Sequence, residues 1–129
     1  MDIDRIMDLL DWNNPPEVQE EGRSLARSIR CINVFLQPMH PGHDKNVWDN
    51  CAIILSERSD QELQPYLIQL FEWLQDMNWP GATVVFNRLC RFKRNELFDD
   101  VLNEKIREAR ALHDYNWFCS LVDLKKNKR

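Results

Sequence analysis

Residues 59–88 constrain the fold more than any other part of this chain. The first half carries an apolar stripe with the three- and four-residue spacing of one helix face, formed by Leu63, Tyr66, Leu67, Leu70, Phe71 and Leu74. Residues 76–81 then form a turn, and Pro80 suits the start of a second helix because proline lacks an N–H that would be unpaired there. The segment therefore predicts a helical hairpin, the unit of arrays that more often bind partners than catalyse reactions.

The same periodicity recurs along the whole chain and predicts a helix between each pair of turn signals. We expect helices at about residues 2–10, 16–31, 45–57, 59–74, 80–91 and 95–112, and a last one beginning at Asp114. Residues 32–36 either continue the second helix or form a short extra turn, and residues 37–44 form the longest loop. No segment alternates β-branched residues between turns, so the sequence predicts an all-α domain of antiparallel hairpins.

Polar side chains mark three of the predicted helix starts. Asp2 and Asp114 are suitable N-caps, and Ser59 with Glu62 three residues later fits a capping box. In the helix at 95–112, the side chains expected to be buried are Leu97, Phe98, Val101, Leu102, Ile106 and Ala109.

Length and composition exclude several classes of protein. A chain of 129 residues is expected to form one domain, residues 1–129, with a basic end at 125–129. Three glycines are too few for a glycine-rich phosphate loop, and no Cys-x-x-Cys pair indicates a zinc or redox site, so each of the four cysteines is expected to be a small buried side chain. The absence of a signal sequence and of any long apolar run predicts a cytoplasmic protein without a membrane segment.

The tryptophans supply the first candidate binding surface. Trp12 and Trp79 both follow a predicted helix and stand beside Asn13 and Asn78 in turns. Each ring either packs across a helix junction or serves as an exposed interface anchor. Because neighbouring hairpin turns line one edge of an array, the four residues can contribute to a single partner-binding surface.

The arginines of the fifth predicted helix supply the second candidate surface. Arg88, Arg91 and Arg94 recur every three residues, with Lys93 beside them. They either pair with neighbouring acids or form a surface for phosphates or an acidic partner. A net charge of −4 and a sequence pI of about 5.4 oppose a general nucleic-acid binder.

Few residues are candidates for metal binding or catalysis. His40, His43 and Asp44 place three possible metal ligands within five residues, but their spacing fits no zinc signature, and we expect a polar turn there. Asp99 and Asp100 point about 100° apart on a helix and form no acid–base pair. We therefore predict no catalytic residues, no metal and no cofactor.

Residues 63–82, together with 11–15 and 48–52, resemble a small bacterial family of uncharacterised proteins, and the similarity covers most of the chain. That family is known only as a domain of unknown function, and it looks like a short HEAT-type helical array. The resemblance implies a HEAT- or ARM-like stack of hairpins and supplies no catalytic residues. Compact acidic bacterial proteins of this type also resemble immunity proteins, which neutralise a cognate toxin.

These observations predict a non-enzymatic protein-binding module whose contact residues are Trp12, Asn13, Asn78, Trp79, Arg88 and Arg91. An immunity protein that occludes a toxin is its most concrete form, and the acidic first half, with 12 acids and 6 bases in residues 1–64, suits a basic partner. Two alternatives remain open. One is a HEAT-like nucleic-acid-binding protein or DNA-base glycosylase, with Trp73, Trp79 and Asp76 near the damaged base, and the other is a scaffold subunit of a larger complex.

Overall fold

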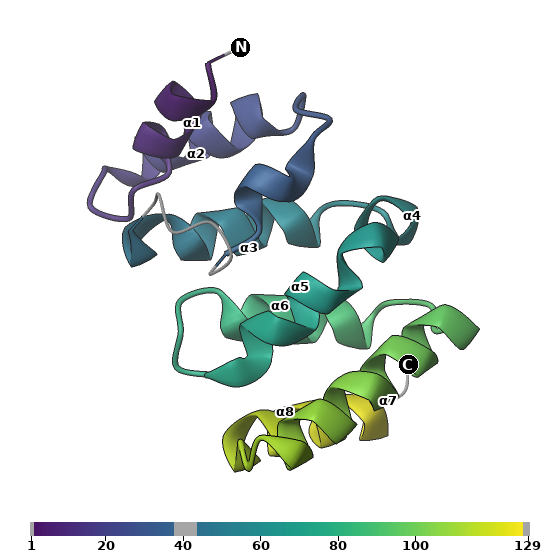
Figure 1. Cartoon of the computed structure of the whole chain (residues 1–129). Coiled ribbons are helices and arrows are strands. Elements are labelled where there is room, and N and C mark those ends of the chain that lie inside the picture. The colour runs from purple at the N-terminus through teal and green to yellow at the C-terminus, as the bar shows by residue number, and fades with distance from the viewer. Residues whose placement is uncertain (1, 38–43, 128–129) are drawn as a thin grey trace.

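The computed structural model of the chain describes residues 2–37 and 44–127, and within these ranges the backbone forms helices and turns without a strand (Figure 1). This confirms the all-α class. The α-helices are α1 (Ile3–Leu9), α2 (Pro16–Ala26), α3 (Trp48–Ser56), α4 (Asp60–Leu63), α5 (Leu67–Glu72), α6 (Ala82–Cys90), α7 (Glu96–Ala111) and α8 (Tyr115–Lys126). Short 3-10 helices join them: η1 (Ile32–Phe35), η2 (Lys45–Val47), η3 (Gln64–Tyr66) and η4 (Trp73–Gln75).

The helix starts follow the capping chemistry predicted from the sequence. The Asp2 carboxylate accepts from the N–H of Asp4 at 2.9 Å, and the Asp114 carboxylate accepts from that of Trp117 at 3.2 Å. Ser59 and Glu62 form the reciprocal capping box at the start of α4. Capping therefore sets where these helices begin.

The helices lie in layers that succeed one another from the N-terminus to the C-terminus. Figure 1 shows the α1–α2 pair above α3, then α5 and α6, and the α7–α8 pair at the far end. The most extensive packing joins α1 to α2, α3 to α6 and α7 to α8. One hydrophobic core runs through these layers, from Ile6 in α1 to Leu124 in α8.

One predicted helix ends earlier than expected, and another is divided into shorter helices. The second helix ends at Ala26, whose carbonyl accepts from Nη2 of Arg58 at 2.8 Å, and residues 32–35 form a separate 3-10 turn, one of the two alternatives above. The predicted helix at 59–74 is divided into α4, η3, α5 and η4. Pro65 causes the break between α4 and α5 because it has no N–H to continue the helical hydrogen bonds.

Three expectations about burial are wrong. Leu97, predicted to be buried, is 47% exposed because it lies at the outer edge of α7 next to α5. Cys31 and Cys119 are also exposed, whereas Cys51 and Cys90 are buried as predicted. Burial raises the pKa of the Cys51 thiol to about 12, so this thiol stays protonated and acts as a packing group.

Candidate functional site

Several hairpin turns face the left of the view in Figure 1, one below another. They join α1 to α2, η4 to α6, and α7 to α8. We name this surface the turn edge and define it by Trp12, Asn13, Asn78, Trp79 and residues 112–116. It contains four of the six contact residues predicted from the sequence.

Trp12 occupies a turn and is 44% exposed. Its backbone N–H donates to the carbonyl of Asn46 at 3.0 Å, and its own carbonyl accepts from Nε2 of Gln19 at 3.2 Å. The N–H of Asn13 donates to the Asp11 carboxylate at 2.8 Å, which fixes the next residue of the turn. A rigid backbone thus presents an exposed aromatic ring, the arrangement typical of an interface anchor.

Trp79 is placed differently, because its ring is half-buried. It packs edge-on against Trp48 at 5.8 Å between ring centroids, and Trp48 in turn packs against Trp73 at 6.4 Å. Nε1 of Trp73 donates to the carbonyl of Pro80 at 3.1 Å. Trp79 therefore has the packing role that was one of the two interpretations, and it supports the turn edge from within.

Asn78 lines a polar groove of about 240 Å³ between the η4–α6 turn and α8. The lining residues are Asp76, Met77, Asn78, Asn116, Cys119 and Ser120. The Asp76 carboxylate accepts from the N–H of Asn78 at 2.8 Å and orders the turn. The side-chain amides of Asn78 and Asn116 make no hydrogen bond within the described ranges, so each can both donate to and accept from a partner.

The structure adds residues that the sequence argument missed. Leu112 and Tyr115, in the turn between α7 and α8, are among the most exposed large hydrophobic side chains that the structure describes. Between them, His113 adopts a left-handed backbone with φ 57°, and its Nδ1 lies 3.2 Å from the Tyr115 hydroxyl. A sequence signal existed, because Tyr115 lies off the face of α8 formed by Trp117, Leu121 and Leu124.

The arginine stripe is divided, and two of its members are used in hydrogen bonds to other parts of the protein. Nη2 of Arg88 donates to the Asp60 carboxylate at 2.5 Å and to the Arg58 carbonyl at 2.9 Å. Arg94 donates to the carbonyls of Leu124, Lys125 and Asn127 at the end of α8. Arg91 is exposed, but it follows α6 at the end away from Asn78. Neither Arg88 nor Arg91 therefore joins the turn edge.

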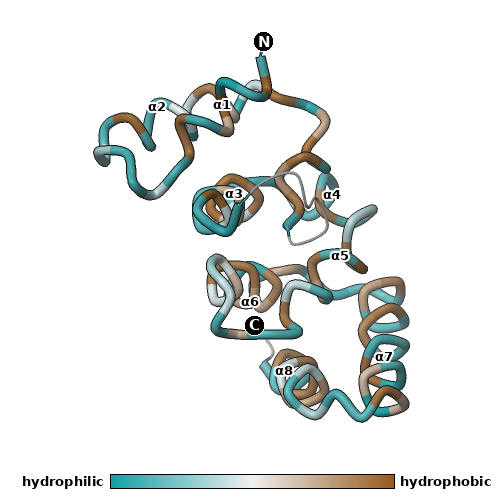
Figure 2. Tube along the Cα trace, turned by 60° about the vertical axis from the view of Figure 1, so that its left-hand side comes forward, coloured by the Kyte–Doolittle hydropathy of each residue, from teal (hydrophilic) through white to brown (hydrophobic). Residues whose placement is uncertain are grey.

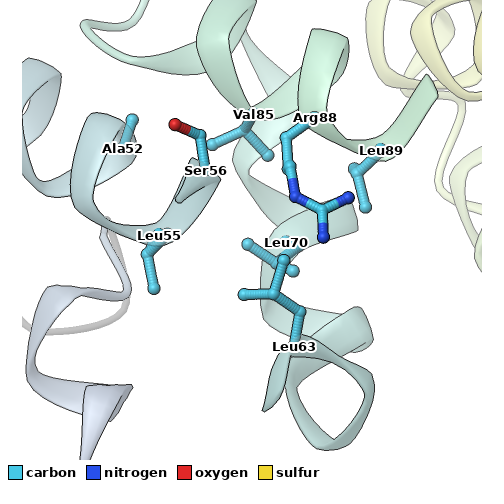
Figure 3. A pocket seen from close by; sticks show the side chains of 8 residues that line it. All are labelled: Ala52, Leu55, Ser56, Leu63, Leu70, Val85, Arg88 and Leu89. Atoms are coloured by element: carbon cyan, nitrogen blue, oxygen red, sulfur yellow. The ribbon is translucent and has the colours of Figure 1, made fainter. Parts of the chain in front are cut away.

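Arg88 also borders a small internal cavity between α3 and α6. Figure 3 shows its guanidinium beside apolar side chains of α3, α4, α5 and α6, among them Leu55, Leu63 and Leu70. The cavity has a volume of about 10 Å³, which is at the lower limit for a single water molecule. It is a packing defect and cannot admit a substrate.

The described ranges contain no group of three or more His, Cys, Asp and Glu side chains placed to hold a metal ion. His40 and His43, considered above as possible ligands, lie outside these ranges, and Asp44 is exposed at the start of η2. In the part of the chain that the structure describes, no helix combines the length and apolar character needed to cross a membrane.

Comparison with known proteins identifies a family for most of the chain. Residues 43–127 match the family described as a domain of unknown function, DUF5071. No curated protein and no solved structure matches the chain. The match begins just before η2 and extends through α8, so it includes the η4–α6 and α7–α8 turns of the turn edge, and the α1–α2 turn precedes it. Because this match spans more than half of the sequence, the chain belongs to the DUF5071 family.

Proposed function

We propose that this protein is a non-enzymatic, cytoplasmic protein-binding module and that the turn edge is its contact surface. The observation that carries the proposal is the placement of two exposed aromatic side chains, Trp12 and Tyr115, on the same edge as the groove lined by the amides of Asn78 and Asn116. Aromatic anchors next to unpaired polar groups are typical of protein interfaces. Trp12 and Tyr115 supply apolar contact area, and the amides supply directional hydrogen bonds.

A bacterial immunity protein is the most concrete form of this proposal. Its mechanism is the steric occlusion of a toxin by the turn edge, and the acidic first half of the chain favours a basic partner. The division of the arginine stripe favours protein binding over the nucleic-acid alternative, because Arg88 and Arg94 are used in internal contacts. A scaffold role would use the same surface with a different partner.

We further propose that the layers form a short HEAT-like stack. A repeated contact supports this arrangement. Nη2 of Arg58 donates to the carbonyl of Ala26, 32 residues earlier, and Nη2 of Arg88 donates to the carbonyl of Arg58, 30 residues earlier. In each case an arginine reaches the end of the preceding layer, as expected for stacked hairpins of similar length.

Affinity capture from a lysate of the native host tests the function, with tagged wild-type protein and a Trp12→Ala, Tyr115→Ala variant in parallel. Both rings are exposed, so the variant should keep its fold, and its thermal unfolding checks this. We expect a stoichiometric protein partner that resists nuclease treatment and is lost with the variant. Asp8→Asn, at an exposed site in α1, is the control and should retain the partner. Recovery of nucleic acid, or capture that is unchanged in the variant, would contradict the proposal.

A further inference from the structure

A second exposed apolar surface lies away from the turns. A groove of about 210 Å³ runs between the η3–α5 segment and α7, and its lining consists of Gln64, Pro65, Leu67, Ile68, Leu97 and Val101. Figure 2 shows α7 along one side of the molecule, next to α5. Ile68 is 44% exposed and Leu97 is 47% exposed, whereas Leu67 is buried at the base.

These two side chains do not belong to the turn edge. The exposed large hydrophobic side chains in the described ranges fall into two groups, one formed by Trp12, Leu112 and Tyr115 and the other by Ile68 and Leu97. The second pair converges on one groove from two different helices. Apolar side chains that meet in an open groove, rather than being scattered singly, are typical of a binding site.

The rim of the groove is acidic. On α7, Asp100 follows the lining residue Leu97 by three positions, and Glu104 follows the lining residue Val101 by three positions. Both acids therefore lie on the same helix face as the lining. On α5, Glu72 follows Ile68 by four positions. Within the described part of the chain, none of these three carboxylates has an ion-pair partner closer than 4.0 Å.

Lys105 on α7 offsets part of the negative charge of Glu72 and Glu104. The ammonium of Lys105 is held by the Glu108 carboxylate at 2.7 Å. The pKa of Glu72 is raised because burial disfavours the charged carboxylate. Lys105 opposes this shift, and a smaller repulsion from Glu108 adds to it. The negative charge of the rim is therefore only partly compensated.

We propose that this groove is a second docking site, which takes a basic amphipathic helix from another protein. One large apolar side chain of that helix sits between Ile68 and Leu97, and lysine or arginine side chains face Glu72, Asp100 and Glu104. Helices commonly bind in this way, with apolar anchors in a groove and charges along its border. A second copy of this chain is a poorer occupant, because a two-fold contact would bring two acidic rims together.

The probe for this site is a fluorescent peptide of leucine and lysine, roughly 16 residues long and patterned as an amphipathic helix. Binding to the full chain is measured by fluorescence anisotropy at low and at physiological salt. The apolar lining is tested by the Ile68→Ser, Leu97→Ser variant and the rim by Asp100→Asn, Glu104→Gln. Matched controls are Leu112→Ser, an exposed leucine of the turn edge, and Asp8→Asn, Asp123→Asn, which removes two charges elsewhere.

We expect the lining variant to weaken binding by about tenfold or more, which corresponds to one apolar anchor. The rim variant should weaken it severalfold and flatten its salt dependence. The controls should remain within about twofold of the wild type, and a peptide with glutamate in place of lysine should not bind. Thermal unfolding verifies that each variant is folded.

Three results would overturn the proposal. One is wild-type affinity in both the lining and rim variants, and another is an equal loss in the matched controls. The third is a concentration-dependent dimer of the wild type that Leu97→Ser dissolves in sedimentation velocity, because the groove would then be covered by a second copy. A loss confined to Leu112→Ser would instead place the peptide on the turn edge, so the variants distinguish the two surfaces.

Discussion

Arg88 shows how a residue type that often marks a binding surface can instead hold layers of a protein together. Its side chain is only 10% exposed and bridges the Asp60 carboxylate and the Arg58 carbonyl. Partial burial of Asp60 alone would raise its pKa, but hydrogen bonds from the Lys93 N–H and from Arg88 outweigh this effect and lower it. The Asp60 carboxylate therefore stays ionised beside Arg88.

Replacement of this arginine by methionine should be strongly destabilising. Arg88→Met removes the donor to the Arg58 carbonyl and the charged partner of the Asp60 carboxylate, which keeps only the Lys93 N–H, so we expect a loss of about 2 kcal/mol in the free energy of unfolding. Urea denaturation at neutral pH measures it. Arg91→Met, at an exposed site three residues later, is the control and should cost less than about 0.5 kcal/mol. Similar losses in both variants would contradict an internal role specific to Arg88.

In contrast to Arg88, the Glu72 carboxylate should lower the stability of the fold at neutral pH. Its folded pKa lies above the ordinary value, chiefly because of burial, so it stabilises the fold at low pH and loses that contribution as pH rises through the folded pKa. Glu72→Gln should therefore raise the melting temperature at pH 7. The gain in the free energy of unfolding should be less than about 1 kcal/mol, because the carboxyl group is partly solvated. At a pH of about 3, where the carboxyl is protonated in both states, the gain should vanish.

Glu62→Gln is the matched comparison and should change the melting temperature in the opposite direction. The Ser59 N–H first, and then the Arg58 guanidinium, lower the pKa of Glu62. A lowered folded pKa gives stability that is present above the unfolded value and is lost as pH falls through the folded one. Glu62→Gln should therefore lower the melting temperature at pH 7. The same sign of change in both variants would refute this assignment of the two carboxylates.

At the scale of elements, local chemistry predicted helix starts well and helix ends poorly. Asp2, Ser59 and Asp114 cap helices through contacts within a few residues, which a sequence shows directly. At the end of α2 the Ala26 carbonyl accepts from Arg58, 32 residues away, and no local pattern contains that contact. Pro65 is a helix-breaking residue that the sequence shows, but the apolar stripe on both sides of it favoured the prediction of one continuous helix.

The contact between α3 and α6 depends on a glycine that the sequence marked only as a turn residue. Gly81 has φ 83°, and a Cβ there would lie 2.8 Å from both the Ala52 Cβ and the Trp48 carbonyl oxygen. Gly81→Ala combines a left-handed backbone with an overpacked junction, so we expect a loss of at least about 2 kcal/mol in unfolding free energy. Thermal unfolding measures it, with the exposed Thr83→Ala in α6 as control. A loss no larger than that of the control would show that the two helices separate at little cost.

At the scale of the whole molecule, the sequence predicted the all-α class and the turns that carry the candidate site, but not how the side chains divide between core and surface. Trp12 and Trp79 have the same local context, yet one is exposed and the other packs on Trp48. That difference depends on which segments meet in space. For the same reason Arg88, part of a regular arginine stripe, turned out to be an internal contact.

The attachment of the N-terminal hairpin is another feature that only the assembled chain shows. Residues 1–42 lie outside the DUF5071 match, yet α1 and α2 share the hydrophobic core with the rest of the protein. Asn50 in α3, which is buried, joins the two parts. Its Nδ2 donates to the Leu10 carbonyl at 2.7 Å and to Oε1 of Gln19 at 2.9 Å, and its Oδ1 accepts from Arg23 at 2.5 Å. A single amide thus connects α3 to the end of α1 and to α2.

Asn50→Leu should loosen this hairpin more than the remainder of the fold. The apolar side chain removes the donor to the Leu10 carbonyl and to Oε1 of Gln19 and one of the two acceptors of Arg23, which keeps Glu20, at a cost of about 3 kcal/mol. Hydrogen exchange should show faster exchange in α1 and α2 while α7 and α8 keep most of their protection. Asn87→Leu, at an exposed position of α6, should leave both regions unchanged. If protection instead fell equally in all helices, the N-terminal hairpin would be an inseparable part of one cooperative unit, and the family match would cover only part of what folds together.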